Sequence, residues 1–215
     1  MLSLSLGDPA QPLNVLCLGA HSDDIEIGAG ATILQWLADG RKLNVRWCVA
    51  SAIGERQEEA RASALEFLEG AQDVAFEFGD FRDGYFPSEA SRLKDWVESL
   101  KSGPKPDIIL THRRDDAHQD HRTICELTWN AFRDHVILEY EIPKWDGDVG
   151  RPNIYVQVSD EALTRKIALL DKHFGTQRSK AWFDDETFRG LARLRGVECR
   201  ARYAEAYVAR KMLLG

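Results

Sequence analysis

The sequence has few cysteines, no long apolar run and no excess of positive charge. Its four cysteines, Cys17, Cys48, Cys125 and Cys199, lie far apart and form no C-x-x-C pair, which excludes a disulfide framework and a cysteine zinc site. No apolar run approaches the roughly 18 residues that a membrane span needs. Residues 1–11 contain no Lys or Arg and too short an apolar stretch for a secretory signal. We therefore expect buried free thiols, no membrane span and a cytoplasmic location.

The composition is that of an ordinary globular protein. Hydrophobic residues make up 44% and charged residues 29% of the 215 residues, which argues against wholesale disorder. Lys and Arg number 28 against 35 Asp and Glu, giving a formal net charge of −7, and a mildly acidic chain is a poor candidate for nucleic-acid binding. We expect one domain over 1–215, with the part from about 143 as either its end or a cap.

Short apolar runs alternate along the chain with segments of helical periodicity. The runs predict strands, at 13–20, 43–50, 73–78, 107–111, 136–142 and 153–158. The periodic segments predict helices, at 28–39, 56–68, 88–100, 121–135, 162–174 and, for the most part, 185–212. Such alternation is typical of right-handed βαβ units, so we expect an α/β fold with a mostly parallel sheet. The segment 143–152 is expected to be a loose surface loop.

Two polar clusters stand where predicted strands end. The first strand leads into 21–24 (HSDD), and the fourth leads into 111–121 (THRRDDAHQDH). Four of the six histidines lie in these two stretches. In open α/β sheets, ligands bind beyond the carboxyl ends of the strands, so the two clusters can meet over one crevice. Charged groups this dense beside apolar strands need partners, and a divalent metal is the simplest one.

The residue types of these clusters suit a catalytic zinc ion, which takes three protein ligands and one water. His21 and Asp24 are three residues apart, so a tight turn can aim both at one ion. His121 is the expected third ligand, at the start of a helix for which Asp120 is a candidate N-cap.

Two further residues of the clusters are candidates for catalysis. Asp23 stands beside the ligands and could take a proton from a metal-activated water. His118 stands one turn before the third ligand and could stabilise the oxyanion of a substrate carbonyl. Each cluster alone also suits ordinary turn and cap residues, but together they favour a metal site.

The two clusters resemble a known family. The segment 19–33 (GAHSDDIEIGAGATI) is similar to the AHPDDE-type signature of the PIG-L/LmbE zinc-dependent deacetylases, and 111–122 (THRRDDAHQDHR) is similar to their second signature, HxxNDxHxDHR. Weaker similarities extend along most of the chain, at 56–60, 81–86, 173–177, 195–196 and 204–207. Ser22 and Arg114 stand where the family usually or often has Pro, and Asp115 replaces a frequent Asn. These departures concern loop rigidity and substrate choice rather than the proposed ligands.

The resemblance implies a Rossmann-like three-layer fold with the site at the carboxyl ends of the strands. It implies that zinc, or another divalent ion such as Fe²⁺, is held by the three expected ligands, and that Asp23 is the general base and His118 assists the oxyanion. The implied substrate is a small N-acetylated sugar or sugar conjugate, from whose amide nitrogen an acetyl group is removed. The pathway this suggests is the biosynthesis of a glycan or a sugar-derived metabolite. The sequence favours no particular oligomeric state.

Several residues outside the ligand set are candidates for substrate contacts. These candidates, which follow predicted strand ends, are Arg56, Asp83, Arg113 and Arg114. Each of them also suits an ordinary solvated or turn position. Tyr85 and Trp145 could stack on a sugar ring, although core filling is the favoured interpretation. Gly28 and Gly30 superficially suggest a nucleotide loop, but close helix–strand packing is the favoured interpretation of both.

Two other functions fit the same clusters. A metal-dependent phosphoesterase would use more carboxylates and often two metals about 3.5–4 Å apart; three further aspartates, Asp115, Asp116 and Asp120, keep this alternative open. A non-catalytic Rossmann-like module would hold a structural zinc, but such sites are closed and usually contain cysteine. No cysteine adjoins either cluster.

Overall fold

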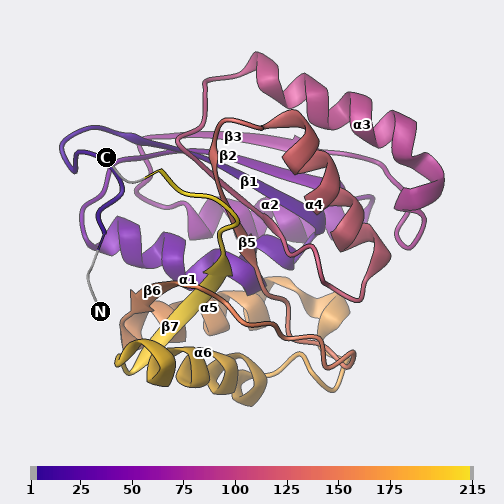
Figure 1. Cartoon of the computed structure of the whole chain (residues 1–215). Coiled ribbons are helices and arrows are strands. Elements are labelled where there is room, and N and C mark those ends of the chain that lie inside the picture. Colours follow the sequence, from indigo (N-terminus) through magenta and orange to yellow (C-terminus); the bar gives the residue numbers. More distant parts are fainter. Residues whose placement is uncertain (1–3, 214–215) are drawn as a thin grey trace.

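The computed structural model describes residues 4–213. They form one seven-stranded sheet in the order β3-β2-β1-β4-β5-β7-β6, with helices on both faces (Figure 1). The strands are β1 (Leu13–His21), β2 (Leu43–Ser51), β3 (Asp73–Phe78), β4 (Ile108–His112), β5 (Val136–Tyr140), β6 (Ile154–Val158) and β7 (Tyr203–Val208). The α-helices are α1 (Asp24–Ala38), α2 (Glu55–Phe67), α3 (Ala90–Ser99), α4 (Gln119–Ala131), α5 (Asp160–His173) and α6 (Asp185–Cys199).

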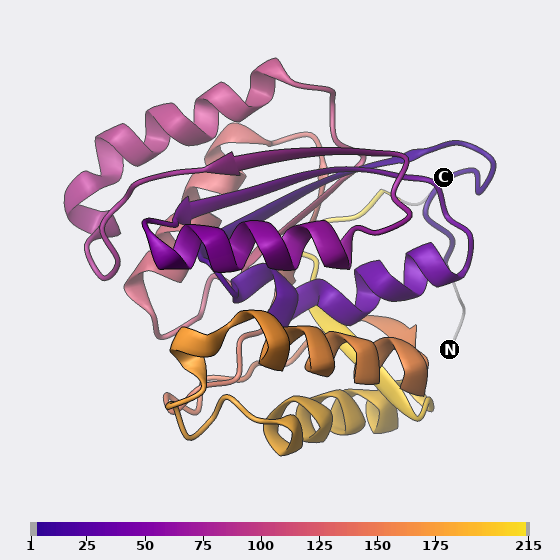
Figure 2. The same ribbon diagram turned by 180° about the vertical axis from the view of Figure 1, so that it is seen from behind.

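The predicted three-layer α/β architecture is confirmed. Strands β1 to β5 are parallel, and β7 pairs antiparallel with both β5 and β6. One face of the sheet carries α3 and α4, and the other carries α1, α2, α5 and α6; Figure 2 shows the same layers from behind. Strands β6 and β7, which follow residue 143, extend the same sheet. No helix within 4–213 is long and apolar enough to cross a membrane.

The predicted helix over 185–212 is wrong in its second half. Helix α6 ends at Cys199, and 203–208 form β7, between β5 and β6. The left-handed conformation of Arg200 (φ 63°) ends the helix. Ala and Glu favour helix locally, but these residues are buried in the sheet, where Glu205 pairs with Lys166 of α5 (Oε1–Nζ 2.6 Å). Tertiary contacts therefore override the local preference of this segment.

Close packing around α1 explains both glycines: Gly28 packs against a strand, as predicted, but Gly30 packs against another helix. A Cβ at Gly28 would overlap the ring of Tyr140 on β5, and one at Gly30 would lie 2.6 Å from the Phe67 ring of α2. Neither glycine has positive φ, so the space, and not the backbone conformation, requires glycine. The four cysteines are buried free thiols, also as predicted.

The carboxyl ends of the parallel strands meet at one edge of the sheet. Figures 1 and 2 both show the loops at this edge, among them 79–86, 113–118, 143–150 and 176–184. The two polar clusters leave β1 and β4 at this edge. The fold therefore places the candidate site where the alternation of strands and helices predicted it.

Candidate functional site

The first polar cluster forms a tight turn between β1 and α1. Asp24 is the first residue of α1, where an acidic side chain suits the helix N-terminus. Its Oδ2 accepts a hydrogen bond from the backbone N of His21 (2.6 Å) and lies 3.3 Å from His21 Nδ1. The spacing of three residues thus brings imidazole and carboxylate together, as expected.

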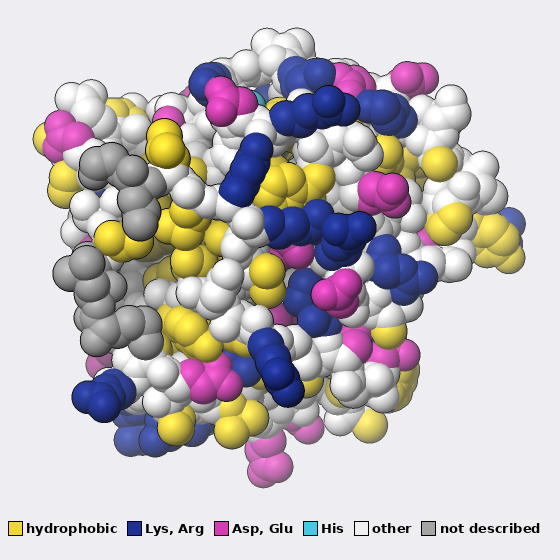
Figure 3. Space-filling view, in the orientation of Figure 1, with side chains coloured by type: hydrophobic (Ala, Val, Ile, Leu, Met, Phe, Trp, Pro, Cys, Tyr) yellow, Lys and Arg dark blue, Asp and Glu magenta, His cyan; other side chains and the backbone are white. Residues whose placement is uncertain are grey.

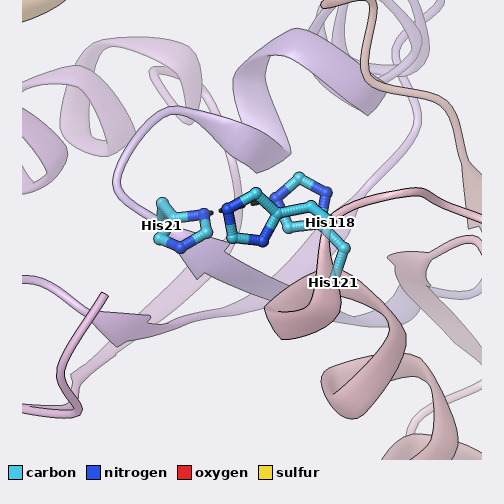
Figure 4. Close-up of side chains that lie close together, drawn as sticks. All are labelled: His21, His118 and His121. Carbon is cyan, nitrogen blue, oxygen red and sulfur yellow. Dashed lines mark hydrogen bonds between the residues drawn. The ribbon is translucent and has the colours of Figure 1, made fainter. Parts of the chain in front are cut away.

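The second cluster brings His121 to the same point. Its Nε2 lies 3.2 Å from His21 Nδ1 (Figure 4). The same nitrogen lies 3.5 Å from Asp24 Oδ1. A tetrahedral zinc bound at about 2.0–2.1 Å holds its ligands roughly 3.3 Å apart. The two ring nitrogens therefore have the spacing of two zinc ligands, and each lies close to a different oxygen of Asp24. Two imidazoles with one carboxylate are a donor set that catalytic zinc uses.

Carboxylates also engage the other ring nitrogens of these two histidines. Asp116 Oδ2 lies 3.0 Å from His121 Nδ1. Asp120 Oδ2 lies 3.3 Å and Asp83 Oδ1 lies 3.1 Å from His21 Nε2. A carboxylate behind a ligating histidine fixes its tautomer and raises its basicity as a ligand. Both rings are thus oriented with one nitrogen toward the point they share with Asp24.

Asp120 does not cap α4, contrary to the expectation. The N-cap is His118, whose Nδ1 accepts a hydrogen bond from the backbone N of Asp120 (3.2 Å). The Asp120 carboxylate instead accepts hydrogen bonds from the backbone N of Gly84 (2.6 Å) and of Phe86 (3.1 Å). It therefore fastens the loop after β3 to the start of α4.

The capping role of His118 determines its tautomer. Because Nδ1 accepts a hydrogen bond, the proton of the neutral ring is on Nε2. The ring centroid lies 4.9 Å from that of His21 and 4.7 Å from that of His121 (Figure 4). His118 therefore offers an N–H donor beside the two histidines of the candidate metal site.

Asp23 is the N-cap residue of α1, but its side chain makes no capping hydrogen bond. Its Oδ1 accepts a hydrogen bond from Arg56 NH2 of α2 (2.8 Å) instead. Arg56 also donates from NH1 to Thr176 Oγ1 (3.0 Å), and Thr176 lies in the 3₁₀ turn after α5. The structure thus brings Arg56 to the site and connects the candidate base to the segment 173–177.

His112 belongs to the site, although sequence reasoning assigned it no role. It is fully buried at the end of β4, and its Nε2 lies 3.1 Å from Asp24 Oδ2 and accepts a hydrogen bond from the backbone N of Ala20 (2.9 Å). Its ring stacks on that of His121 at 3.9 Å. Its place as the last residue of an apolar strand and the first histidine of the second signature was the available signal.

The side-chain spacing permits more than one ligand group among the described residues. Three close groups of possible ligands, which divide the expected three between them, are formed by His21, His118 and His121, by Asp24, His112 and His121, and by His21, Asp83, His118 and Asp120. In the last group, Asp83 is exposed on its loop. In the expected set, each histidine has a carboxylate on its other ring nitrogen: Asp116 beside His121 Nδ1, and Asp83 and Asp120 beside His21 Nε2.

Burial and neighbouring charges shift the pKa values of the three expected ligands in different directions. Burial disfavours a charged His21, but the carboxylate of Asp24 and its neighbours outweigh it and raise the pKa of His21 well above the usual 6.5. Burial and the nearby His112 lower the pKa of His121. The neighbouring histidines outweigh burial at Asp24 and lower its pKa. The cluster therefore favours one positive charge between anionic carboxylates, which a divalent cation can replace.

Arg113 and Arg114 contact the loop after β5 and β5 itself, respectively. The Arg113 side chain is buried and donates to the carbonyl oxygen of Asp148, while the backbone N of Arg114 donates to Glu139 Oε2 (3.0 Å). Both line a hollow of about 710 Å³, together with further residues: Asp115, Glu139, Arg151, Val208 and Arg210. Figure 3 shows Lys and Arg side chains gathered on the face of the molecule drawn in Figure 1.

Tyr85 and Trp145 do not fill the core, so that interpretation was wrong. Their exposed fractions are 46% and 70%. Tyr85 lies under the guanidinium of Arg82 (3.6 Å to the ring centroid), and Trp145 makes an edge contact with Trp182 (6.3 Å between centroids). Both stand on loops at the edge of the sheet that carries the site.

An α/β sheet with a histidine–carboxylate cluster at its strand ends defines a class of candidate metal-dependent enzymes. The profile of the PIG-L family, described as GlcNAc-PI de-N-acetylase, matches residues 16–132. The uncharacterized deacetylase YaiS of Escherichia coli (strain K12) is 30% identical over 174 residues, covering 74% of this chain and 89% of YaiS. The chain belongs to the PIG-L family.

Solved structures with the same fold differ in activity. The N,N'-diacetylchitobiose deacetylase from Pyrococcus horikoshii matches with a TM-score of 0.68 at 20% identity, covering 95% of this chain and 86% of that one. GalB, the 4-carboxy-2-hydroxymuconate hydratase from Pseudomonas putida KT2440, matches with a TM-score of 0.69 at 18% identity, covering 94% and 98%. The fold alone therefore does not select the reaction, which has to be argued from the site.

Proposed function

We propose that this protein is a zinc-dependent hydrolase that removes an acetyl group from the amide nitrogen of a small N-acetylated sugar or sugar conjugate. Within this proposal, His21, Asp24 and His121 hold the metal. The observation that carries it is the spacing of these three side chains, with pairwise atom distances of 3.2–3.5 Å. Membership of the PIG-L family and the deacetylase relative support the reaction type.

A divalent ion held there would lower the pKa of a bound water from 15.7 toward about 7 and polarise the acyl oxygen. Asp23 accepts the proton of the attacking water and, once protonated, gives it to the leaving amine nitrogen. Water and amide thus become carboxylic acid and amine. The hydrogen bond from Arg56 to Oδ1 keeps the Asp23 carboxylate directed out of α1 rather than capping it.

His118 stabilises the oxyanion within this proposal. Its Nδ1 is engaged by the backbone of α4, so Nε2–H is the donor that remains. An oxyanion donor held in place before the reaction needs no reorganisation when charge develops on the acyl oxygen. The hydrogen bond that caps α4 thereby also orients the catalytic donor.

The site loops support a ring-shaped substrate. Asp83, Tyr85 and Trp145 lie on loops at the same edge of the sheet as the metal ligands. A solvent-exposed indole or phenol ring offers a flat apolar face for a sugar ring, and a carboxylate can accept hydrogen bonds from its hydroxyls. We propose that the reaction belongs to the biosynthesis of a glycan or a sugar-derived metabolite, because its product is an amino sugar.

An acetate-release screen tests the proposal. The zinc-loaded protein is incubated with N-acetylated monosaccharides, disaccharides, nucleotide sugars and glycosides, with and without a chelator, and Asp23→Asn serves as the inactive control. Chelator-sensitive acetate release from at least one of these is expected. Phosphate release from phosphoesters, together with two bound ions per chain, would replace the deacetylase with a phosphoesterase.

A further inference from the structure

A lysine outside both sequence clusters reaches the metal site from the loop 143–152. The Lys144 side chain is only 7% exposed. Its Nζ lies 3.0 Å from Asp116 Oδ1 and 2.7 Å from Asp148 Oδ2. A long charged side chain is rarely buried without paired charges, and here the two carboxylates supply the pairing. This part of the loop is therefore fastened to the site, and the expectation of a loose surface loop was wrong for Lys144.

The two carboxylates that Lys144 contacts hold the segment 117–121, which contains both His118 and His121. Asp116 accepts the backbone N–H of His118 on Oδ1 (2.8 Å) and lies 3.0 Å from His121 Nδ1 through Oδ2. Asp148 Oδ2 accepts the backbone N–H of Ala117 (2.6 Å), directly before His118. Lys144 thus stands one carboxylate away from the candidate metal ligand and from the candidate oxyanion donor.

The charge of Lys144 has a specific consequence for His121. Asp116 is almost fully buried, with an exposed fraction of 2%. Its two oxygens are divided between His121 Nδ1 and Lys144 Nζ, so the lysine fixes the rotation of the carboxyl group that holds the imidazole. In this arrangement Nδ1 of His121 faces Asp116 and Nε2 faces the metal position. A cation on the far oxygen of Asp116 stabilises that arrangement.

We infer that Lys144 is a positioning residue of the metal site: through Asp116 it holds His121 with Nε2 free for the metal, and through Asp116 and Asp148 it holds the backbone ahead of His118. This inference rests on the proposed metal site. Lys144 touches neither the metal position nor the reacting atoms. It extends the site from the two strand-end clusters to a loop that follows β5.

Metal affinity tests this role without a substrate. Zn²⁺ and Co²⁺ affinities are measured by chelator competition for wild type, Lys144→Met and Lys144→Arg. Lys101→Met is the matched control, because Lys101 is also paired with a carboxylate, Glu98, but lies far along the chain from the site. Loss of partners behind metal ligands commonly costs 10–100-fold in affinity. Lys144 acts on His121 through Asp116 rather than directly, so we expect the lower end of this range, a loss of about tenfold in metal affinity for Lys144→Met.

A double-mutant cycle with Asp116→Asn identifies the route. If Lys144 acts through Asp116, Lys144→Met should cost much less in the Asp116→Asn background than in wild type. The visible absorption spectrum of the Co²⁺-loaded protein should change in Lys144→Met and return in Lys144→Arg, because the charge restores the orientation of His121. Thermal melts of the metal-free variants show whether each is folded.

Two results would overturn the inference. Affinity of Lys144→Met equal to that of Lys101→Met would remove Lys144 from the metal site. Equal losses of affinity in Lys144→Met and Lys144→Arg, with both metal-free proteins less stable, would assign Lys144 to folding alone. A wild-type protein that binds neither ion would instead refute the proposed metal site itself, and the role of Lys144 with it.

Discussion

Two histidines three residues apart have opposite environments. His121 turns Nε2 toward His21 and Asp24 and is supported behind by Asp116. His118 uses Nδ1 to cap α4 and keeps Nε2–H free. The same residue type thus has the geometry of a ligand at one position and of a hydrogen-bond donor at the other.

This contrast predicts different losses on substitution. His121→Ala should lose the metal, whereas His118→Ala should retain it and lose about 10²–10³-fold in kcat, the usual effect of removing an oxyanion donor. Elemental analysis and steady-state kinetics of both variants check this. Metal loss in His118→Ala with retention in His121→Ala would mean that the two roles are exchanged.

Asp23 should be required for turnover and not for metal binding. Asp23→Asn keeps the shape of the side chain and a hydrogen bond to Arg56 but removes the basic carboxylate. General base catalysis commonly contributes about 10²–10⁴-fold, so a rate loss of that size with full metal occupancy is expected. Asp171→Asn, at an exposed aspartate of α5, is the control. Turnover close to wild type in Asp23→Asn would exclude it as the base.

The structure also specifies the protonation state in which His118 works. Burial, followed by the charges of His121 and His21, lowers the pKa of His118 below the usual 6.5. Lowering the pKa of a histidine favours its neutral form, so above about pH 6.5 His118 is neutral with its proton on Nε2. An imidazolium donor, which would lose activity on deprotonation as the pH rises, is therefore not the form favoured here.

The pH–rate profile distinguishes these forms. If neutral His118 is the donor, it does not titrate on the alkaline side of the profile and causes no loss of activity there. His118→Ala should then lower kcat and leave any alkaline limb of the profile in place. Profiles of wild type and His118→Ala between pH 6 and 10 measure this. Disappearance of an alkaline limb in the variant would show that the imidazolium is the working form.

At the scale of elements, the local patterns predicted most of the strands and helices but not every boundary. The apolar runs of β1, β2, β4 and β5 are largely buried, so their composition identifies them, whereas β3 lies at the sheet edge and is mostly exposed. Helix α1 begins at Asp24, four residues before the predicted start, because residues of the metal turn also form its first turn. Strand β7 was not predicted because Ala204, Glu205 and Ala206 have helical preferences. The buried ion pair of Glu205 with Lys166, which favours the strand, cannot be inferred from the local sequence.

The packing of α1 on β5 connects an element to the site. Tyr140 of β5 fills the space beside Gly28, donates to the carbonyl oxygen of Leu18 (2.7 Å) and lies 3.3 Å from His112 Nε2. A methyl group at residue 28 would displace this ring and with it the support of His112. The glycine in the first signature therefore serves the metal turn through packing.

Gly28→Ala should consequently destabilise the protein. Overpacking a tight core commonly costs about 1–3 kcal/mol, and the free energy of unfolding from urea denaturation measures it. Gly190→Ala is the control, because a Cβ there meets no atom within 4 Å in the middle of α6, and Gly to Ala in a helix is neutral or stabilising. Equal stability of Gly28→Ala and Gly190→Ala would mean that the contact with Tyr140 adjusts freely.

At the scale of the whole molecule, the two strand-end clusters could be predicted to meet because parallel strands share one carboxyl edge. The partners that complete the site could not. Lys144 and Thr176 come from loops whose positions depend on the antiparallel strands β6 and β7 and on α5. The sequence contains no motif that would indicate their contacts with the site around His21 and His121. Such contacts follow from tertiary packing, which local patterns do not specify.

The candidate ligands come from three elements at the carboxyl ends of the neighbouring strands β1 and β4. His21 ends β1, Asp24 begins α1, and His121 lies in the first turn of α4, on the opposite face of the sheet from α1. An ion bound by all three joins both helical layers at the strand ends. Metal binding should therefore stabilise the global fold and not only a local turn, since the ligands are far apart in the unfolded chain.

The expected size of this effect follows from mass action. A ligand that binds only the folded state at 1,000 times its Kd stabilises by about 4 kcal/mol. Adding Zn²⁺ to the metal-free protein should raise Tm until one ion per chain is bound, and a chelator should reverse the shift. The Tm of His21→Ala should not rise with Zn²⁺. Saturation at two ions per chain, with both contributing to Tm, would contradict a mononuclear site and favour the two-metal chemistry of a phosphoesterase.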